Sequence, residues 1–259
     1  MSQLKYHSAA VALLPKPPRF SESAAHAVRE RERQLGIALP DSVREWYSLE
    51  DAAGLLGSYS NDDWPINASQ LGEPFENWFG QGERDFLSQN LLIFMHENQG
   101  VCNWAIKLTG DPDPPVVNEE TSAPGAVWLP CADAFSTFIR SQIWDRVGPE
   151  TVGVDANGVE LLPNDLEFLK SCFDQRPTTW GWPGRSNYRF ENNDGRIIVY
   201  DGEDRGRGGA DWHVYARTIP GLKRLLEKIW HCSQLAESLY GDRESEGVLK
   251  QLRGSLGNE

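Results

Sequence analysis

Apolar residues recur at helical spacing in two segments near the start of the chain. The segment SESAAHAVRERERQLG (21–36) has a narrow apolar stripe on an otherwise charged helix, and its last residue is a glycine of the kind that ends helices. The segment IALPDSVREWYSL (37–49) contains a proline suited to the first helical position. Its apolar residues Val43, Trp46 and Tyr47 follow the i, i+3, i+4 rule. We therefore predict two amphipathic helices.

The middle of the chain carries the clearest strand pattern. Residues 90–95, NLLIFM, form a continuous apolar run typical of a buried central strand, and residues 101–108, VCNWAIKL, alternate between the two faces of a strand. Between them, the polar segment HENQG (96–100) has a glycine suited to positive φ. The pattern predicts a β-hairpin with a polar tip, preceded by a mainly irregular stretch over residues 57–89.

Three further elements are predicted in the first half. The proline-broken segment GDPDPPVVNEE (110–120) indicates a turn and a short edge strand, and GAVWLP (125–130) indicates another strand. In ADAFSTFIRSQIWDRV (132–147), the apolar residues form one stripe, which predicts an amphipathic helix. The quieter residues 147–163 are expected to join the two halves.

The second half shows a similar succession of patterns. Residues 164–173, NDLEFLKSCF, predict a helix with Asn164 as its N-cap and Glu167 completing a capping box. NYRFE and RIIVYDG flank the turn NNDG (192–195) and give the best hairpin signal in the chain. The strand-like DWHVYAR follows, and a last helix is predicted from Thr218.

Both halves share the order helix, irregular piece, hairpin, further strand and helix, without a residue-level repeat. Hairpins require antiparallel pairing, and helices that bracket a run of strands give an α+β fold. We predict a mixed, mainly antiparallel sheet flanked by helices over residues 22–146. A C-terminal α+β unit is expected over 164–231, on the same sheet or as an appended domain. Residues 1–21 and 241–259 are expected to be tails.

The charge balance limits the classes of partner. Asp and Glu outnumber Lys and Arg by 38 to 25, so the formal net charge is −13. Such a field repels nucleic acid and anionic membranes, which both need basic patches, and favours a basic partner. Solubility alone is the other explanation of an acidic composition. We expect neither a nucleic-acid partner nor a membrane partner.

The four cysteines stand far apart without a CxxC motif, which argues against a zinc ribbon and a thioredoxin-like motif. The short apolar run at residues 9–14 is followed by prolines, so it is too short for a membrane span and poor as a signal peptide. We therefore expect a cytoplasmic protein with reduced thiols.

The sequence shows no catalytic constellation. Adjacent strand residues point to opposite faces, so His96 and Glu97 are not expected to converge on one substrate, and HEN is not the HExxH of zinc proteases. The chain lacks a GxSxG elbow and a P-loop. We expect no catalytic residue, no metal site and no cofactor. The polar residues 97–99 are expected either to satisfy backbone groups of the turn or to contact a partner.

The candidate binding residues are three tryptophans in apparent loops, Trp104 of the predicted strand, and polar residues of the hairpin tip and the acidic loop. Such a tryptophan either fills the core or contacts a ligand, and interface hot spots are rich in tryptophan. The acidic pairs at 62–63 and 119–120 are expected to be solvated and able to form an acidic rim. The candidate partner-binding residues are Asp62, Asp63, Trp64, Glu97, Asn98, Gln99, Trp104, Trp180 and Trp182.

Several short features occur in order over residues 22–146. They are Leu39-Pro40, the strand end Glu97-Asn98-Gln99-Gly100, Trp104, Asp113-Pro114-Pro115-Val116 and the aromatic helix Phe135 to Ile139. In this order they resemble the SUKH superfamily, which includes fungal cell-wall-assembly regulators and bacterial immunity proteins of polymorphic toxin systems.

The resemblance implies an α+β binding fold without catalysis. Bacterial members are thought to bind and neutralise toxin domains, many of them nucleases, and an acidic surface suits that role because nucleases are basic where they hold phosphates. We therefore expect a protein-binding module, an immunity protein for a basic toxin domain. The alternatives are a regulatory scaffold of the fungal type, and a small-molecule or peptide binder or hydrolase with a pocket lined by Trp64, Trp104 and Trp180.

Overall fold

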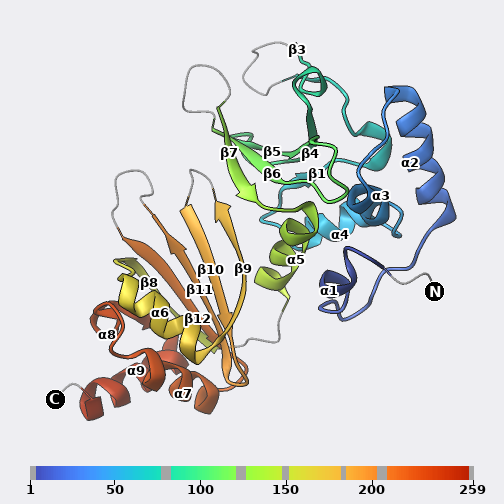
Figure 1. The fold of residues 1–259 in the computed structure, drawn as a ribbon. Helices are drawn as coiled ribbons and strands as arrows, with labels where there is room; N and C mark the ends of the chain where they lie inside the picture. The colour runs from blue at the N-terminus through green and yellow to red at the C-terminus, as the bar shows by residue number, and fades with distance from the viewer. Residues whose placement is uncertain are drawn as a thin grey trace. The chain divides into compact units, whose positions relative to one another are not determined.

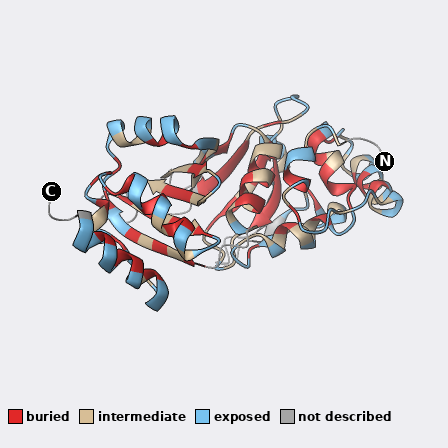
Figure 2. Ribbon diagram, turned by 90° about the horizontal axis from the view of Figure 1, so that it is seen from below, coloured by how far each residue is buried: buried red, intermediate tan, exposed pale blue. Residues whose placement is uncertain are grey.

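The chain forms two compact units, Met1–Val147 and Gly148–Glu259 (Figure 1). The computed structural model describes residues 4–76, 83–120, 127–147, 152–181, 185–202 and 209–256. In each unit, helices pack against an antiparallel sheet, which confirms the predicted α+β class. Figure 2 shows that buried residues lie mainly in the strands and on one side of the helices.

The first unit begins with helices separated by short turns. They are α1 (Ser8–Val11), α2 (Glu22–Leu35), α3 (Asp41–Tyr47) and α4 (Ala52–Ser58). The hydroxyl oxygen of Ser21 accepts a hydrogen bond from the Ala24 amide at 3.2 Å and caps α2, and Gly36 ends this helix with φ of 68°. The helices α2 and α3 are those that the apolar spacing predicts.

The sheet of the first unit has the strand order β1-β4-β5-β6-β7. Its strands are β1 (Trp64–Pro65), β4 (Leu91–His96), β5 (Asn103–Lys107), β6 (Val116–Glu120) and β7 (Val127–Ala132). The strands β4 and β5 form the predicted hairpin, and all residues of β4 are buried. The prediction of an edge strand at 116–120 is wrong, because β6 pairs with both β5 and β7. The prolines that suggested an edge precede the strand, so each residue of β6 keeps its amide donor.

Beyond the end of α4, the described part of residues 57–89 contains only short regular elements, as predicted. They are β1, η1 (Ala68–Gln70), η2 (Leu87–Gln89) and the ribbon of β2 (Phe75–Glu76) and β3 (Glu83–Arg84). The predicted helix after β7 is α5 (Phe135–Arg146).

The sheet of the first unit buries apolar residues on both faces. On one face, Leu92, Phe94 and Ile106 share a core with residues of α2, α3, α4 and α5. On the other face, Ile93 and Ala105 belong to a smaller cluster with Phe86, Leu91 and Val117. A strand that is covered on both sides reads as a continuous apolar run, which explains the sequence of β4.

The segment before α2 was expected to be a tail, yet it packs into the first unit. Ala10, Val11 and Leu14 are buried. The Glu45 carboxylate accepts hydrogen bonds from the backbone amides of residues 5, 6 and 7 at 2.7–2.8 Å. This carboxylate therefore fixes the segment to α3.

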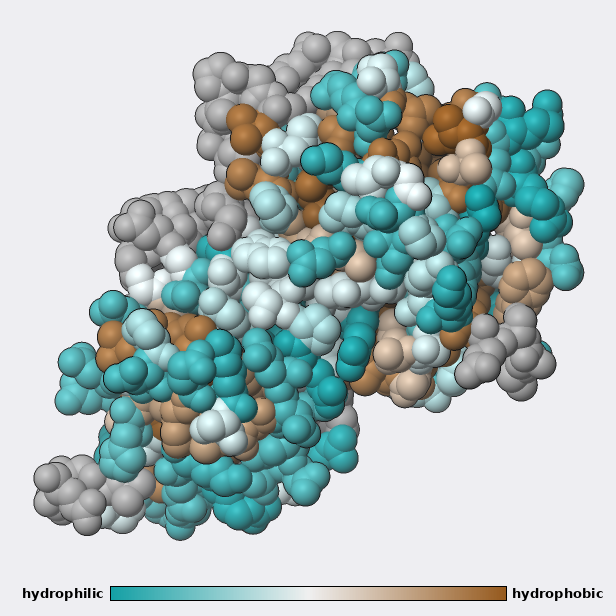
Figure 3. Space-filling model, viewed as in Figure 1, coloured by the Kyte–Doolittle hydropathy of each residue, from teal (hydrophilic) through white to brown (hydrophobic). Residues whose placement is uncertain are grey.

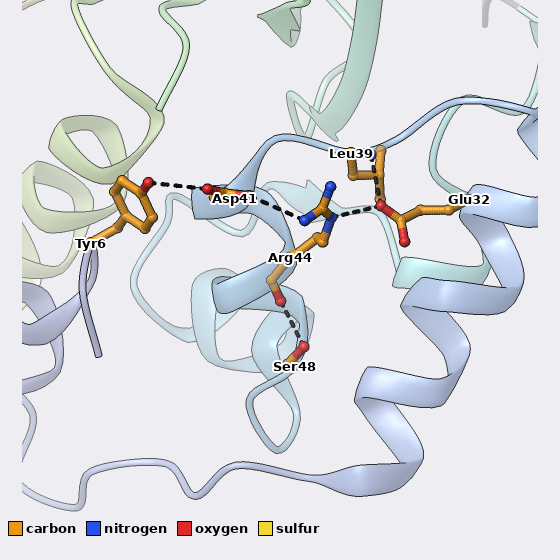
Figure 4. A network of polar contacts seen from close by, with 6 residues as sticks. All are labelled: Tyr6, Glu32, Leu39, Asp41, Arg44 and Ser48. Carbon is orange, nitrogen blue, oxygen red and sulfur yellow. Dashed lines mark hydrogen bonds and ion pairs between the residues drawn. The ribbon is translucent and has the colours of Figure 1, made fainter. Parts of the chain in front are cut away.

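Polar side chains also join α3 to its neighbours (Figure 4). Glu32 of α2 accepts hydrogen bonds from the Arg44 guanidinium at 2.7 Å and from the Leu39 amide at 2.8 Å. Arg44 donates to Asp41 at 3.1 Å, and Asp41 also accepts from the Tyr6 hydroxyl at 3.4 Å. The network links the start of the chain, α2 and α3.

The second unit has a separate sheet with the order β13-β8-β12-β11-β10-β9. Its elements are β8 (Val152–Val159), α6 (Pro163–Cys172), β9 (Asp174–Gly181), β10 (Arg185–Glu191), β11 (Gly195–Asp201), β12 (Ala210–Ala216), α7 (Ile219–Ile229), α8 (Leu235–Ser238), β13 (Tyr240–Gly241) and α9 (Arg243–Leu256). Residues of α6, α7 and α9 share one core with the sheet. The strands β10 and β11 form the predicted hairpin, and Asn192 closes its turn by accepting from the amides of Asp194 and Gly195.

Three expectations for the second half differ from the structure. The expected junction contains β8, which lies between β13 and β12. The expected C-terminal tail contains α9, whose Leu249 and Leu252 are buried. The predicted capping box is absent from α6, because the N-cap is Leu162 and Pro163 occupies the first helical position.

Within the described ranges, the helices are either too short or too polar to cross a lipid bilayer.

Replacing a buried leucine of α9 should destabilise the second unit if this helix is part of its core. Leu252 is 1% exposed and its neighbour Gln251 is exposed. We expect Leu252→Ala to lower the free energy of unfolding by about 2–5 kcal/mol, whereas Gln251→Ala should change it by less than about 0.5 kcal/mol. Urea denaturation measures both. Equal effects of the two changes would show that α9 is not packed.

Candidate functional site

Two groups of the candidate residues meet at one end of the first sheet. The short strand β1 pairs with the end of β4, with Trp64 opposite His96 and Pro65 opposite Met95. Residues 62–64 therefore lie beside the tip of the β4–β5 hairpin. We call residues 62–64 and 97–99 together the edge site.

Glu97 closes the hairpin turn. Its Oε2 atom accepts hydrogen bonds from the backbone amides of Gln99 at 2.7 Å and Val101 at 3.2 Å. Gly100 adopts a φ of 72°, as the turn sequence predicts. Glu97 therefore satisfies backbone groups of the turn, which is one of the two roles expected for it.

Asn98 ties this turn to the loop before β1. Its backbone amide donates to Asp63 Oδ1 at 3.2 Å, and its side-chain amide donates to the carbonyl oxygen of Asn61. The expectation that Asp63 is solvated is wrong, since it is only 9% exposed. Burial raises the pKa of the Asp63 carboxyl, although the amides of Asn98 and Asn61 act in the opposite direction. Asp63 and Asn98 are thus structural members of the edge site.

The exposed members of the edge site are Asp62, Trp64 and Gln99. Trp64 is 45% exposed although tryptophan carries a large apolar surface. Asp62 has a φ of 58°, a conformation that Asp and Asn adopt more readily than most residues. The sheet edge therefore presents an indole ring, a carboxylate and an amide on a backbone held by Asp63, Glu97 and Asn98.

The other candidate tryptophans have different surroundings. Trp104 is half-buried and packs against the first core, with its ring centroid 6.5 Å from that of Phe138. Trp180 is half-buried on β9 opposite Ser186, so it belongs to the second unit and not to the edge site. Trp182 lies outside the described residues.

A buried polar row crosses three strands of the first sheet. His96 Nδ1 lies 2.6 Å from Asn103 Oδ1, and the Asn103 amide donates to Glu119. Glu119 is 1% exposed, so the expectation that it is solvated is wrong; the side chain of Glu120 lies outside the described part. Burial lowers the pKa of His96, against the opposing effects of Asn103 and Glu119. His96 therefore faces this row, and Glu97 holds the turn.

The second sheet contains a histidine–aspartate pair that sequence reasoning missed. His213 Nδ1 on β12 lies 2.7 Å from Asp155 Oδ1 on β8, and the Tyr215 hydroxyl lies 3.3 Å from the same nitrogen. Both His213 and Asp155 are half-buried. The pair joins adjacent strands. In a catalytic triad an aspartate also contacts histidine Nδ1, and this contact is the one feature that the pair shares with a triad. Its two members are 58 residues apart, so no local pattern indicates it.

Within the ranges that the structure describes, no group of three or more His, Cys, Asp or Glu residues is arranged to hold a metal ion. No protein-family model, curated protein or solved structure matches the chain.

The buried histidine of the polar row should make the first unit sensitive to acid. The pKa of His96 is lowered in the folded state, whereas an unfolded chain has histidine pKa values near about 6.5. Below that pH the unfolded state binds more protons, so the free energy of unfolding falls as pH falls. We expect His96→Gln to reduce this loss between pH 7.5 and 5.5, by up to about 1.4 kcal/mol per pH unit.

Urea denaturation at each pH measures the effect. His26→Gln is the matched control, because His26 is exposed on α2. Some pH dependence should persist in His96→Gln, since burial also lowers the pKa of His7. An unchanged pH dependence in His96→Gln would contradict the prediction.

Proposed function

We propose that this chain is a non-catalytic protein-binding module, an immunity protein that neutralises a basic toxin domain of a polymorphic toxin system. The proposal combines the resemblance of residues 22–146 to SUKH proteins with the edge site. The observation that carries it is the exposed Trp64 beside the carboxylate of Asp62 on a fixed sheet edge.

The edge site has the composition of a protein interface. Tryptophan is enriched among the residues that dominate binding energy, because it buries a large area with few rotatable bonds. The contacts of Asp63, Glu97 and Asn98 fix the backbone before a partner arrives. Such preorganisation lowers the conformational entropy lost on binding.

The charge of the chain suits a basic partner. The net charge is −13, and hydrophilic residues cover much of the face of each unit seen in Figure 3. The negative charge of this chain accelerates its association with a basic partner and repels an acidic one. A nuclease toxin must carry a basic surface where it holds phosphates, so it is the kind of partner that this charge favours.

The contacts of the ionisable groups at the edge site support a non-catalytic role. A general base needs a lone pair that a substrate can reach. The Glu97 oxygen Oε2 accepts two backbone amides, and both oxygens of Asp63 accept backbone amides. His96 is 9% exposed and contacts Asn103.

Removing the exposed groups of the edge site should weaken the complex with the toxin domain encoded next to this protein. We expect Trp64→Ala to raise Kd by roughly 30-fold, the equivalent of about 2 kcal/mol. Asp62→Asn removes a negative charge, and asparagine tolerates the positive φ of this position. This change should slow association mainly at low salt. Calorimetry and stopped-flow mixing over a range of ionic strengths measure the two effects.

Matched control variants lie in the second unit. Phe168→Ala removes an aromatic residue that is 38% exposed, and Asp174→Asn removes an exposed carboxylate. Both should leave Kd unchanged. Absence of a complex at any ionic strength would argue against the immunity role, and equal effects of edge-site and control variants would exclude the edge site as the contact surface.

A further inference from the structure

The second unit contains an open cavity, and one of its lining residues, Val159, belongs to the core of that unit. Its volume is about 540 Å³, which lies within the range of small-molecule sites, roughly 300–1,000 Å³. The end of β8, the start of α6, the loop after α7 and the last residue of α8 line it. None of these elements contributes to the edge site.

Ser233, on the cavity lining, connects two of the elements that form it. Ser233 is 8% exposed, donates its hydroxyl hydrogen to Asp165, and accepts a hydrogen bond from the Leu162 amide at 3.2 Å. Its hydroxyl therefore has both a donor and an acceptor partner, and it holds the Asp165 carboxylate in place. The neighbouring Cys232 and Leu235 are buried in the second core, which fixes this loop.

The lining is electrostatically negative. The described residues that line it supply the carboxylates of Glu160 and Asp165 and include neither a lysine nor an arginine. The 11-residue helix α7 ends just before the loop, and the C-terminal end of its dipole adds partial negative charge. The thiol of Cys232 is consistent with this field: burial raises its pKa to about 12, and the charge of Asp165 contributes to the increase.

The lining also offers apolar and neutral polar contacts. Leu162 is 43% exposed although it is apolar, and Val159 is buried beside it. Exposed Gln234 and Ser238 supply oxygen acceptors, and the His231 imidazole is also on the lining. An apolar wall next to two carboxylates suits a group with an aliphatic stem and a cationic end.

We propose that this cavity binds an alkyl guanidinium or alkyl ammonium group, with the cation at Glu160 and Asp165 and the methylene stem against Leu162. The group comes either from a free small molecule or from an arginine or lysine side chain of a peptide. In both cases the cavity would bind the same cationic group and the same methylene stem. The site is independent of the edge site and of the function proposed for it.

Binding of defined probes tests the assignment. The probes are N-butylguanidine as a free alkyl guanidinium and acetyl-Gly-Arg-Gly-amide as a basic side chain, each titrated into the full chain labelled with ¹⁵N. Their neutral counterparts, N-butylurea and acetyl-Gly-citrulline-Gly-amide, replace the guanidinium with a urea. We expect the cationic probes to shift the amide signals of Glu160, Ser233 and Gln234 and to bind at least about tenfold more tightly than the neutral ones. Binding of N-butylguanidine indicates a small-molecule site, and binding of the peptide alone indicates a protein partner.

The variants separate a defined site from general attraction to an acidic protein. Glu160→Gln changes an exposed residue, so it should fold normally, and it should weaken binding by at least about tenfold, as should Asp165→Asn. Glu237→Gln is the matched control, because Glu237 is exposed on α8 but does not line the cavity. Trp64→Ala should leave probe binding unchanged, whatever its effect on a toxin domain. The proposal is overturned if no cationic probe binds at millimolar concentration, or if Glu237→Gln weakens binding as much as Glu160→Gln.

Discussion

The register of the β4–β5 hairpin is the constraint on which the first unit depends. All six residues of β4 are buried, with Leu92 and Phe94 facing the helices and Ile93 facing the smaller cluster. A shift of one residue would exchange the two faces and place each side chain in the wrong core. Glu97 secures this register because its carboxylate holds the turn. Trp64 lies opposite His96 at the end of β4, and the Asn98 amide of the turn donates to Asp63, so the edge site depends on the closed hairpin.

Local periodicity was enough to predict the elements whose patterns are short and complete. The hairpin at 90–108, the helix at 135–146 and the turn at 192–195 all have their signal within a few neighbouring residues. Strand β8 was missed because VGVDANGV contains two glycines and two polar residues, which resemble a loop. Gly153 is required there, since a Cβ atom would lie 2.3 Å from the Tyr215 ring.

The candidate site was only partly predictable, for a different physical reason. The turn position of Glu97 follows from the hairpin pattern, so its contact with turn amides could be anticipated. The burial of Asp63 and Glu119 depends on which segments cover them, and that information is spread over the chain. Asp155 contacts His213 because β8 pairs with β12, although one helix and three strands lie between them in the sequence. The spacing of residues along the sequence therefore does not predict that contact.

The two units also show how far a shared order of elements determines topology. Each contains four consecutive antiparallel strands followed by a helix: β4 to β7 with α5, and β9 to β12 with α7. The fifth strand differs, because β1 joins the first strand of its run whereas β8 joins the last strand of the other. The similar order therefore reflects the general packing of helices on antiparallel sheets, and it is not sufficient to indicate duplication.

Net charge alone does not determine where an acidic protein binds. Asp63 and Glu119 contribute to the charge of −13, yet their oxygens are occupied inside the first unit. The carboxylates that can meet a partner are those that remain exposed, as are Asp62, two residues before Trp64, and Glu160 on the cavity lining. Their surroundings suit different ligands. An exposed ring on a sheet edge fits a broad macromolecular surface, whereas a concave cavity of about 540 Å³ has room for a small group. The shape around each carboxylate, more than its charge, therefore separates the two proposed sites.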